Sequence, residues 1–183
     1  MTKICVFFLL ILLSIIHVRG EENNSNIKKI FKSIEQHDWE LFKTLINAEN
    51  LHNSRKELAQ LFSFQHDEKN HNTFVHHLIE HTQGKQFDSI REEMLHRIGM
   101  IVEHHQTPDK DTHLKWDTLY NDNRQTPLIL AVELNDIIAV RTLLRYNANM
   151  HYSGSQGSPM LTARILNHNE ILQLLKRELI ARK

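Results

Sequence analysis

The stretch TPLILAVELNDIIAVRTLLRYNANM, residues 126–150, carries the signals that decide the fold. It has the pattern of two amphipathic helices separated by Asn135 and Asp136. Thr126 can cap the first helix with its hydroxyl, and Pro127 fits the first helical turn because no N–H is needed there. Asn135 suits the left-handed backbone that ends a helix, and Asp136 stands where the second helix begins. The stretch therefore predicts a helix–turn–helix unit.

The same pattern occurs at three other places in the chain. A forward shift by 32 residues matches Pro127, Ala131, Asn135, Val140 and Leu143 with Pro159, Ala163, Asn167, Leu172 and Leu175. A shift of 98 residues toward the N-terminus matches Ala131, Asp136 and Val140 with Ser33, Asp38 and Phe42. A fourth copy begins at Thr73-Phe74-Val75, with Leu78 at the position of Ala131. The chain therefore contains an internal repeat, and its four copies cover most of the chain after residue 20.

The chain resembles the ankyrin repeat family in three features. The repeat has a period of about 33 residues, T-P-L stands at the start of a short helix, and a small residue follows four positions after the Pro. The resemblance implies an all-α solenoid of about four stacked helix–turn–helix units with short β-turn or hairpin tips. The predicted units are residues 27–47, 68–98, 121–150 and 153–179. The chain departs from the family where Gly is usual in the tips, since it has His71, Arg124 and Gln156. The first unit lacks T-P-L, which suits a terminal capping unit.

The first twenty residues form a separate segment. Lys3 precedes the apolar stretch Ile4 to Ile16, and Val18 and Gly20 supply small residues before a cleavage point. This is the pattern of a secretory signal peptide, shorter than the roughly 18 to 20 apolar residues that span a bilayer. We expect a secreted or periplasmic protein with a mature domain at residues 21–183. The alternative is a membrane anchor that is not cleaved.

Two inserts interrupt the repeats. Residues 48–67 contain Leu58, Leu61 and Phe62 at helical spacing and predict an additional helix. Residues 99–120 include polar loop sequence. Trp116 and Tyr120 in this second insert are either an exposed anchor pair or packed beneath the loop, and packing is slightly favoured.

The sequence holds little that indicates catalysis. There are 22 basic and 22 acidic residues, so the basic excess typical of nucleic-acid binding is absent. His77, Glu80 and His81 match the H-x-x-E-H zinc-peptidase pattern, but coincidence is easy in a chain with 14 histidines. We interpret them as part of the first helix of a repeat, with His76 at the His of the family's T-P-L-H. We interpret Glu92 and Glu93 as residues on the solvent-exposed face of a helix. We expect no catalytic residues, no metal and no cofactor.

The resemblance implies that the protein is a monomer that binds another protein through turn tips and inner helices. The family's variable contact positions fall on Lys69, Asn70, Asn72, Glu80, His81, Asp122, Asn123, Gln125, Glu133, Leu134, Gly154, Ser155, Gly157, Ile165 and Leu166. The first hypothesis is an exported protein-interaction module, such as a secreted effector of a host-associated bacterium. The alternatives are an accessory or inhibitory subunit of another exported protein and, with less support, a zinc hydrolase. Neither a nucleic acid nor, after signal cleavage, a membrane is an expected partner.

Overall fold

The computed structural model describes residues 27–46, 72–104, 116, 119–155 and 157–182. The regular elements in these ranges are helical, so the described part of the chain is all-α, as expected. One isolated antiparallel bridge joins Gly154 to Gly157 in a turn. The predicted signal peptide and the insert at residues 48–67 lie outside the described residues.

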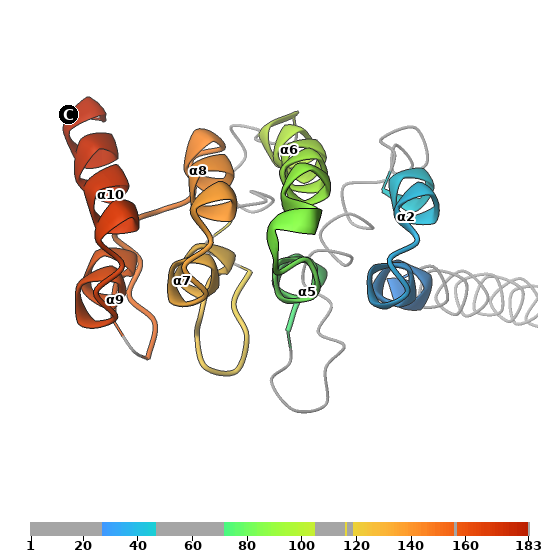
Figure 1. Cartoon of the computed structure of the whole chain (residues 1–183), viewed down its shortest axis with the longest axis horizontal. Coiled ribbons are helices and arrows are strands. Elements are labelled where there is room, and N and C mark those ends of the chain that lie inside the picture. The colour runs from blue at the N-terminus through green and yellow to red at the C-terminus, as the bar shows by residue number, and fades with distance from the viewer. Residues whose placement is uncertain (1–26, 47–71, 105–115, 117–118, 156, 183) are drawn as a thin grey trace, which may run out of the picture.

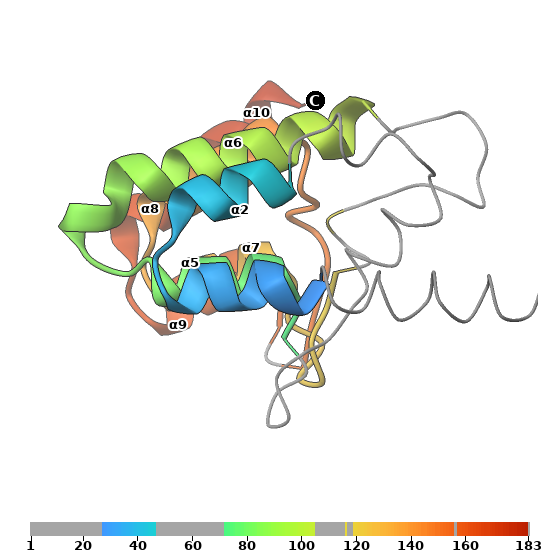
Figure 2. The same cartoon turned by 90° about the vertical axis from the view of Figure 1, so that its right-hand side faces the viewer.

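The helices follow one another along the chain as pairs. The pairs are residues 27–35 with α2 (Trp39–Leu45), α5 (Phe74–His81) with α6 (Asp88–His104), α7 (Pro127–Glu133) with α8 (Ile137–Arg145), and α9 (Pro159–Ile165) with α10 (Asn169–Ala181). A short 3-10 helix, η1 (Lys85–Phe87), connects α5 to α6. The pairs stand side by side in a row (Figure 1), and the first helices form one layer below the second helices (Figure 2). We call the pairs units 1 to 4.

Helices α2, α7, α8 and α9 begin at a side-chain cap, whereas α5 and α10 do not. Asp38, Thr126, Asp136 and Ser158 accept hydrogen bonds from the backbone N–H three residues ahead, at 3.0, 3.4, 3.0 and 3.4 Å. Pro127 and Pro159 occupy the first turns of α7 and α9. The caps supply acceptors for N–H groups that have no partner within the helix, which fixes where each helix starts.

The turn between the two helices is the same in three units. His37, Asn135 and Asn167 have φ angles of 55°, 55° and 57°. In unit 3 the Asn135 N–H donates to Val132 O at 3.1 Å and the Asp136 N–H to Ala131 O at 2.9 Å. Units 1 and 4 repeat this pair of bonds, a common way to end a helix. The turns recur at the spacings found in the sequence, so the predicted role of Asn135 is confirmed.

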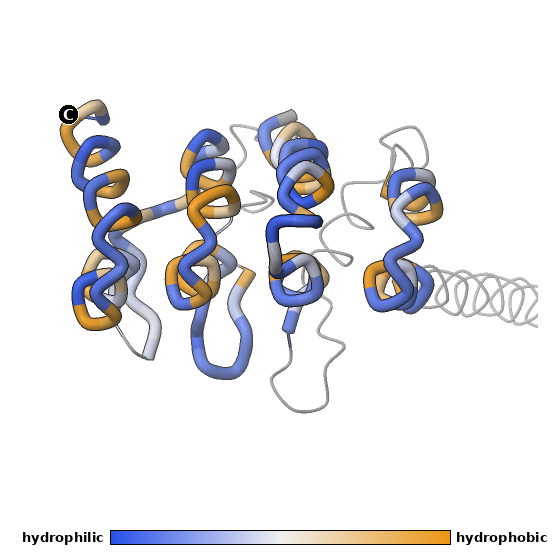
Figure 3. The backbone as a smooth tube through the Cα atoms, viewed as in Figure 1, coloured by the Kyte–Doolittle hydropathy of each residue, from blue (hydrophilic) through white to orange (hydrophobic). Residues whose placement is uncertain are grey.

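Apolar side chains join the units into one continuous core. Apolar and hydrophilic residues alternate along each helix (Figure 3), and the apolar ones form a single buried cluster from unit 1 to unit 4. The equivalent residues Ser33, Ala131 and Ala163 are all 0% exposed. Ser33 donates its hydroxyl to Ile30 O at 2.7 Å, which satisfies the polar group in an apolar setting. Small residues at this position allow neighbouring helices to approach closely.

The insert at residues 99–120 differs from the expected loop in two respects. Helix α6 continues through Gly99 to His104, and at Gly99 the Tyr146 ring packs directly on the helix backbone. Trp116 is buried and donates Nε1–H to Tyr146 O at 2.8 Å, whereas Tyr120 is 46% exposed. The two aromatic residues are therefore neither an exposed pair nor both packed. Trp116 supplies a donor for a carbonyl at the end of α8, and Tyr120 faces solvent.

Candidate protein-interaction surface

The predicted contact positions on the first helices form two repeated rows. Glu80, Glu133 and Ile165 are equivalent residues in the last turns of α5, α7 and α9, and His81, Leu134 and Leu166 follow them. Helix α7 contacts both α5 and α9, so both rows continue from unit 2 to unit 4. We call these six residues the helix-end surface.

The helix-end surface changes in chemistry along the row. Glu80 and Glu133 are half-buried carboxylates, and His81 is exposed. Leu134, Ile165 and Leu166 are 38, 62 and 44% exposed, although they are large apolar residues. Unit 2 is therefore polar at these positions, unit 4 is apolar, and unit 3 combines a carboxylate with a leucine.

Three buried amides hold the two carboxylates in place. Asn72 Nδ2 donates to Glu80 Oε2 at 2.9 Å, and Gln125 Nε2 donates to Glu133 Oε2 at 2.5 Å. Asn121 Nδ2 donates to Asn72 Oδ1 and to Gln125 Oε1, both at 3.0 Å. Asn121 Oδ1 accepts from the backbone N–H of Asn123 and Gln125 at 3.1 and 3.0 Å. We call Asn72, Asn121 and Gln125 the amide network, and it links units 2 and 3.

The amide network corrects two of the predicted contact residues. Asn72 and Gln125 are only 1 and 6% exposed, so their side chains do not face a partner. The two amides hydrogen-bond to the carboxylates beside them and to Asn121, so their polar atoms have partners although they are shielded from water. Their role here is to position Glu80 and Glu133. The sequence analysis missed Asn121, whose signal is the Asn-Asp-Asn run that favours a side-chain-bonded turn.

Burial affects the charge of Glu133. Its Oε1 atom is buried and has no hydrogen-bond partner. Burial raises the pKa of Glu133, and the hydrogen bond from Gln125 offsets part of that rise. Gln125 thus fixes one oxygen of the carboxylate, while the other is buried without a hydrogen-bond partner among the described residues.

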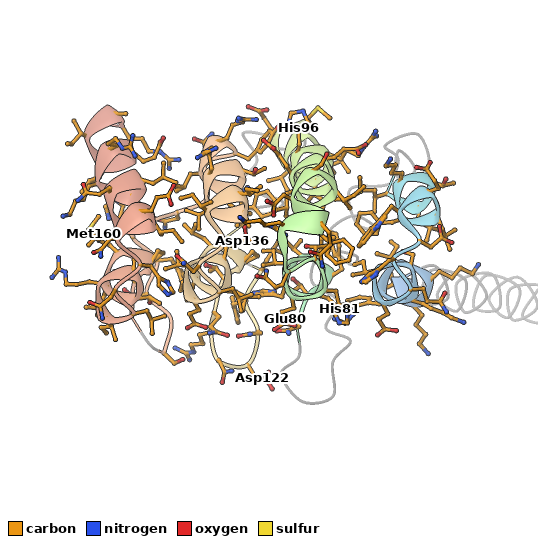
Figure 4. All side chains as sticks on the ribbon, viewed as in Figure 1. Glu80, His81, His96, Asp122, Asp136 and Met160 are labelled. Carbon is orange, nitrogen blue, oxygen red and sulfur yellow. The ribbon has the colours of Figure 1, made fainter. Side chains whose placement is uncertain are left out.

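The tips of units 3 and 4 carry the other predicted contacts. Asp122 and Asn123 are exposed, and Asp122 lies at the far end of its tip, away from the helices (Figure 4). Ser155 N donates to Asn123 O at 3.4 Å, so the two tips touch. Gly154 packs against Arg124 O, where a Cβ atom would collide. Gly157 has a φ of 108°, which favours glycine. Lys69 and Asn70 lie outside the described residues.

The H-x-x-E-H residues make contacts within unit 2 and, through His77, with unit 1. Glu80 accepts from Asn72, while His77 Nε2 lies 3.4 Å from Glu35 Oε1 of unit 1. The His77 and His81 rings are 4.1 Å apart. Among the described residues, no three His, Cys, Asp or Glu side chains are grouped to hold a metal ion. Likewise, no described helix has both the length and the apolarity of a membrane span.

His76 is fully buried between units 2 and 3. Its Nε2 is 2.9 Å from Gln125 O and its Nδ1 is 2.8 Å from Thr73 Oγ1. Because a carbonyl can only accept, Nε2 carries the proton and Nδ1 accepts from the threonine. Burial lowers the pKa of His76 to about 4. The neutral imidazole therefore cross-links a helix start to the tip of the next unit.

A buried ion pair joins units 2 and 3 on the other side of the row, and the sequence analysis missed it. Arg91 Nε lies 2.7 Å from Asp136 Oδ2, with side chains 5 and 1% exposed. Arg91 also pairs with Asp88 at 2.6 Å and donates to Thr82 O. Asp136 thus caps α8 and pairs with an arginine of α6 (Figure 4). The neighbouring Glu92 is exposed as expected, but Glu93 pairs with Lys43 of unit 1 at 3.4 Å.

No protein-family model matches the chain, and a comparison with curated proteins gives no significant match.

Proposed function

We propose that the chain is an exported protein of the ankyrin-repeat type that binds another protein through its tips and the helix-end surface. The observation that carries the proposal is the equivalence of the units. Side-chain caps, left-handed turn residues and buried small residues recur at matching positions in units 1, 3 and 4, and the positions of the helix-end surface recur in units 2 to 4. His76 supports the family assignment, since it cross-links two units from the place of the family's T-P-L-H histidine.

A rigid array suits protein binding for a physical reason. Binding costs free energy when loops and side chains must become ordered. Here the turns, the amide network and the buried pair between Arg91 and Asp136 have already ordered the helix-end surface. The proposal that the protein is exported rests on the sequence of residues 1–20.

A pull-down with the chain as bait tests this function. The disrupted bait carries Asp122→Ala and Asn123→Ala at the exposed tip. Gln125 is left unchanged, because its loss would break the amide network. A matched control carries Glu170→Ala and Gln173→Ala, which remove one carboxylate and one amide from the exposed surface of α10.

We expect a partner that the native bait and the control retain and the tip variant loses. A partner that all three baits retain would contradict binding through the tips. An accessory or inhibitory subunit is the alternative within the same class. It would differ by co-purifying with its partner in a constant ratio without any bait.

A further inference from the structure

The helix-end surface has a periodicity that restricts the kind of segment it can bind. Equivalent residues of neighbouring units are separated by the spacing of packed helices, about 8 to 10 Å. A polyproline II segment rises about 3.1 Å per residue with three residues per turn, so every third side chain returns to the same face after about 9 Å. Such a segment laid across α5, α7 and α9 would present one side chain to each unit.

The chemistry of each unit then selects the side chain. Units 2 and 3 present Glu80 and Glu133, each fixed by an amide. A cationic side chain is the natural complement of these two half-buried carboxylates. A carboxylate that the protein has already oriented loses little entropy when it pairs.

Unit 4 presents an apolar surface at the corresponding place. Ile165 and Leu166 at the end of α9 are well exposed, as is Leu134 at the end of the adjacent α7. Leu161, one turn before Ile165, is 43% exposed. Arg164 is not a residue of this surface, since its equivalent in unit 3 is the fully buried Val132. Adjoining exposed apolar side chains of this kind are typical of an interaction site.

Together these observations extend the proposed function, on which they rest, to the chemistry of the partner. We propose that the helix-end surface binds an extended, polyproline II segment of another protein with basic side chains at two positions three residues apart and a large apolar side chain three residues further on. The basic side chains pair with Glu80 and Glu133, and the apolar side chain covers Ile165, Leu166 and Leu134.

Two defined peptides test this proposal with the full chain. The first is Arg-Pro-Pro-Arg-Pro-Pro-Leu with an amidated C-terminus and a fluorescent label, and the second has Glu in place of both Arg. Binding is measured by fluorescence anisotropy at low and high salt. We expect the arginine peptide to bind at least about tenfold more tightly at low salt than the glutamate peptide.

Variants of the protein separate the two parts of the surface. Glu133→Gln should weaken the arginine peptide about fivefold to tenfold and reduce the salt dependence, because one ion pair is lost. Ile165→Ser should weaken it about fivefold without changing the salt dependence, because only apolar contact is lost. The matched control is Glu170→Gln on the exposed surface of α10, which should bind like the native chain. If Glu133→Gln alters the thermal unfolding, Glu80→Gln in the adjacent unit serves in its place.

The proposal is wrong if the glutamate peptide binds as well as the arginine peptide. It is equally wrong if Glu170→Gln has the effect expected of Glu133→Gln, or if the arginine peptide shows no binding up to about 1 mM. These results differ from a failure of the proposed function. A partner captured through the tips, together with a peptide that does not bind, would leave protein binding intact and remove only the chemistry assigned to the partner.

Discussion

Single residues are most constrained where two units meet. His76 contacts a backbone carbonyl of the next unit and must remain neutral to do so. Gly99 is another such residue, since the ring of Tyr146 occupies the space of a side chain on α6. A proton added to His76 would place a charge in a fully buried site, and a methyl group added at Gly99 would collide with the Tyr146 ring.

Acid should destabilise the protein through His76. The folded-state pKa of about 4 lies below the ordinary value of 6.5, so its stabilisation is complete above pH 6.5 and declines as the pH falls toward 4. The native chain should lose about 3 kcal/mol more than His76→Gln between pH 7 and pH 4. Urea unfolding at several pH values measures this difference. The same experiment with the exposed His151→Gln as control should follow the native chain, and parallel curves for the native chain and His76→Gln would rule the effect out.

Gly99→Ala should destabilise the protein by about 1 to 3 kcal/mol, because the new methyl group meets the Tyr146 ring. In a Tyr146→Ala background the same change should be neutral or stabilise by about 1 kcal/mol, since alanine favours helix over glycine. A double-mutant cycle from chemical denaturation gives both values. Equal costs in the two backgrounds would show that the ring is not the cause.

At the scale of the helices, the turns determine where one helix stops and the next begins. His37, Asn135 and Asn167 all adopt the left-handed conformation, which costs an ordinary residue roughly 1 kcal/mol or more. The following N–H then closes a bond to the end of the preceding helix. Helices of seven residues, such as α7 and α9, depend on such end contacts and on packing, because they are too short to be stable alone.

Asn135 distinguishes conformational strain from the loss of a side chain. Asn135→Ala should destabilise by about 1 kcal/mol, whereas Asn135→Gly should change the stability by less than about 0.5 kcal/mol. Both variants lose the same amide, so the difference reports the backbone alone. The free energies of unfolding in urea provide the comparison. If both variants cost the same, the side chain and not the φ angle matters at this turn.

At the scale of the whole molecule, polar contacts add to the apolar core that joins the units. Units 2 and 3 are connected by His76, by the amide network and by Arg91 with Asp136. Unit 4 is tied to unit 3 by Arg182, which donates to Leu144 O and Ala148 O at the end of α8. Among the described helices, the larger contacts between units join adjacent units, so the stability of the array depends on these interfaces.

Asp136→Asn should destabilise the molecule by about 2 to 4 kcal/mol, because Arg91 would stay buried with only Asp88 as a charged partner. Asparagine still caps α8, so the loss reports the ion pair and not the cap. The matched control is Asp38→Asn, an exposed cap of α2, which should cost less than about 0.5 kcal/mol. Guanidinium unfolding gives both free energies. Similar costs at the two caps would contradict a coupling role for Arg91.

The sequence by itself determined the local features of this protein. Thr126, Pro127, Asn135 and Asp136 act on a few neighbouring backbone groups, so their effect is visible in the chain without knowledge of its partners in space. The repeat spacing follows from the same signals, since each unit uses them again. The equivalence of the units also places Leu134 and Leu166 at matching exposed positions, which the family resemblance predicts as contact positions.

Only the tertiary structure decided which polar and aromatic side chains are buried. Asn72 and Gln125 are of residue types that usually lie at the surface. Here their side chains are buried and hydrogen-bond to Asn121 and to Glu80 and Glu133. Arg91 is buried because Asp136 of the next unit meets it, and Trp116 because Tyr146 O accepts its proton. The contacts of Asn72 with Asn121, of Arg91 with Asp136 and of Trp116 with Tyr146 join residues thirty to fifty positions apart, and such contacts leave no pattern in the local sequence. Such contacts arise only when the folded units come together and their buried polar groups require partners.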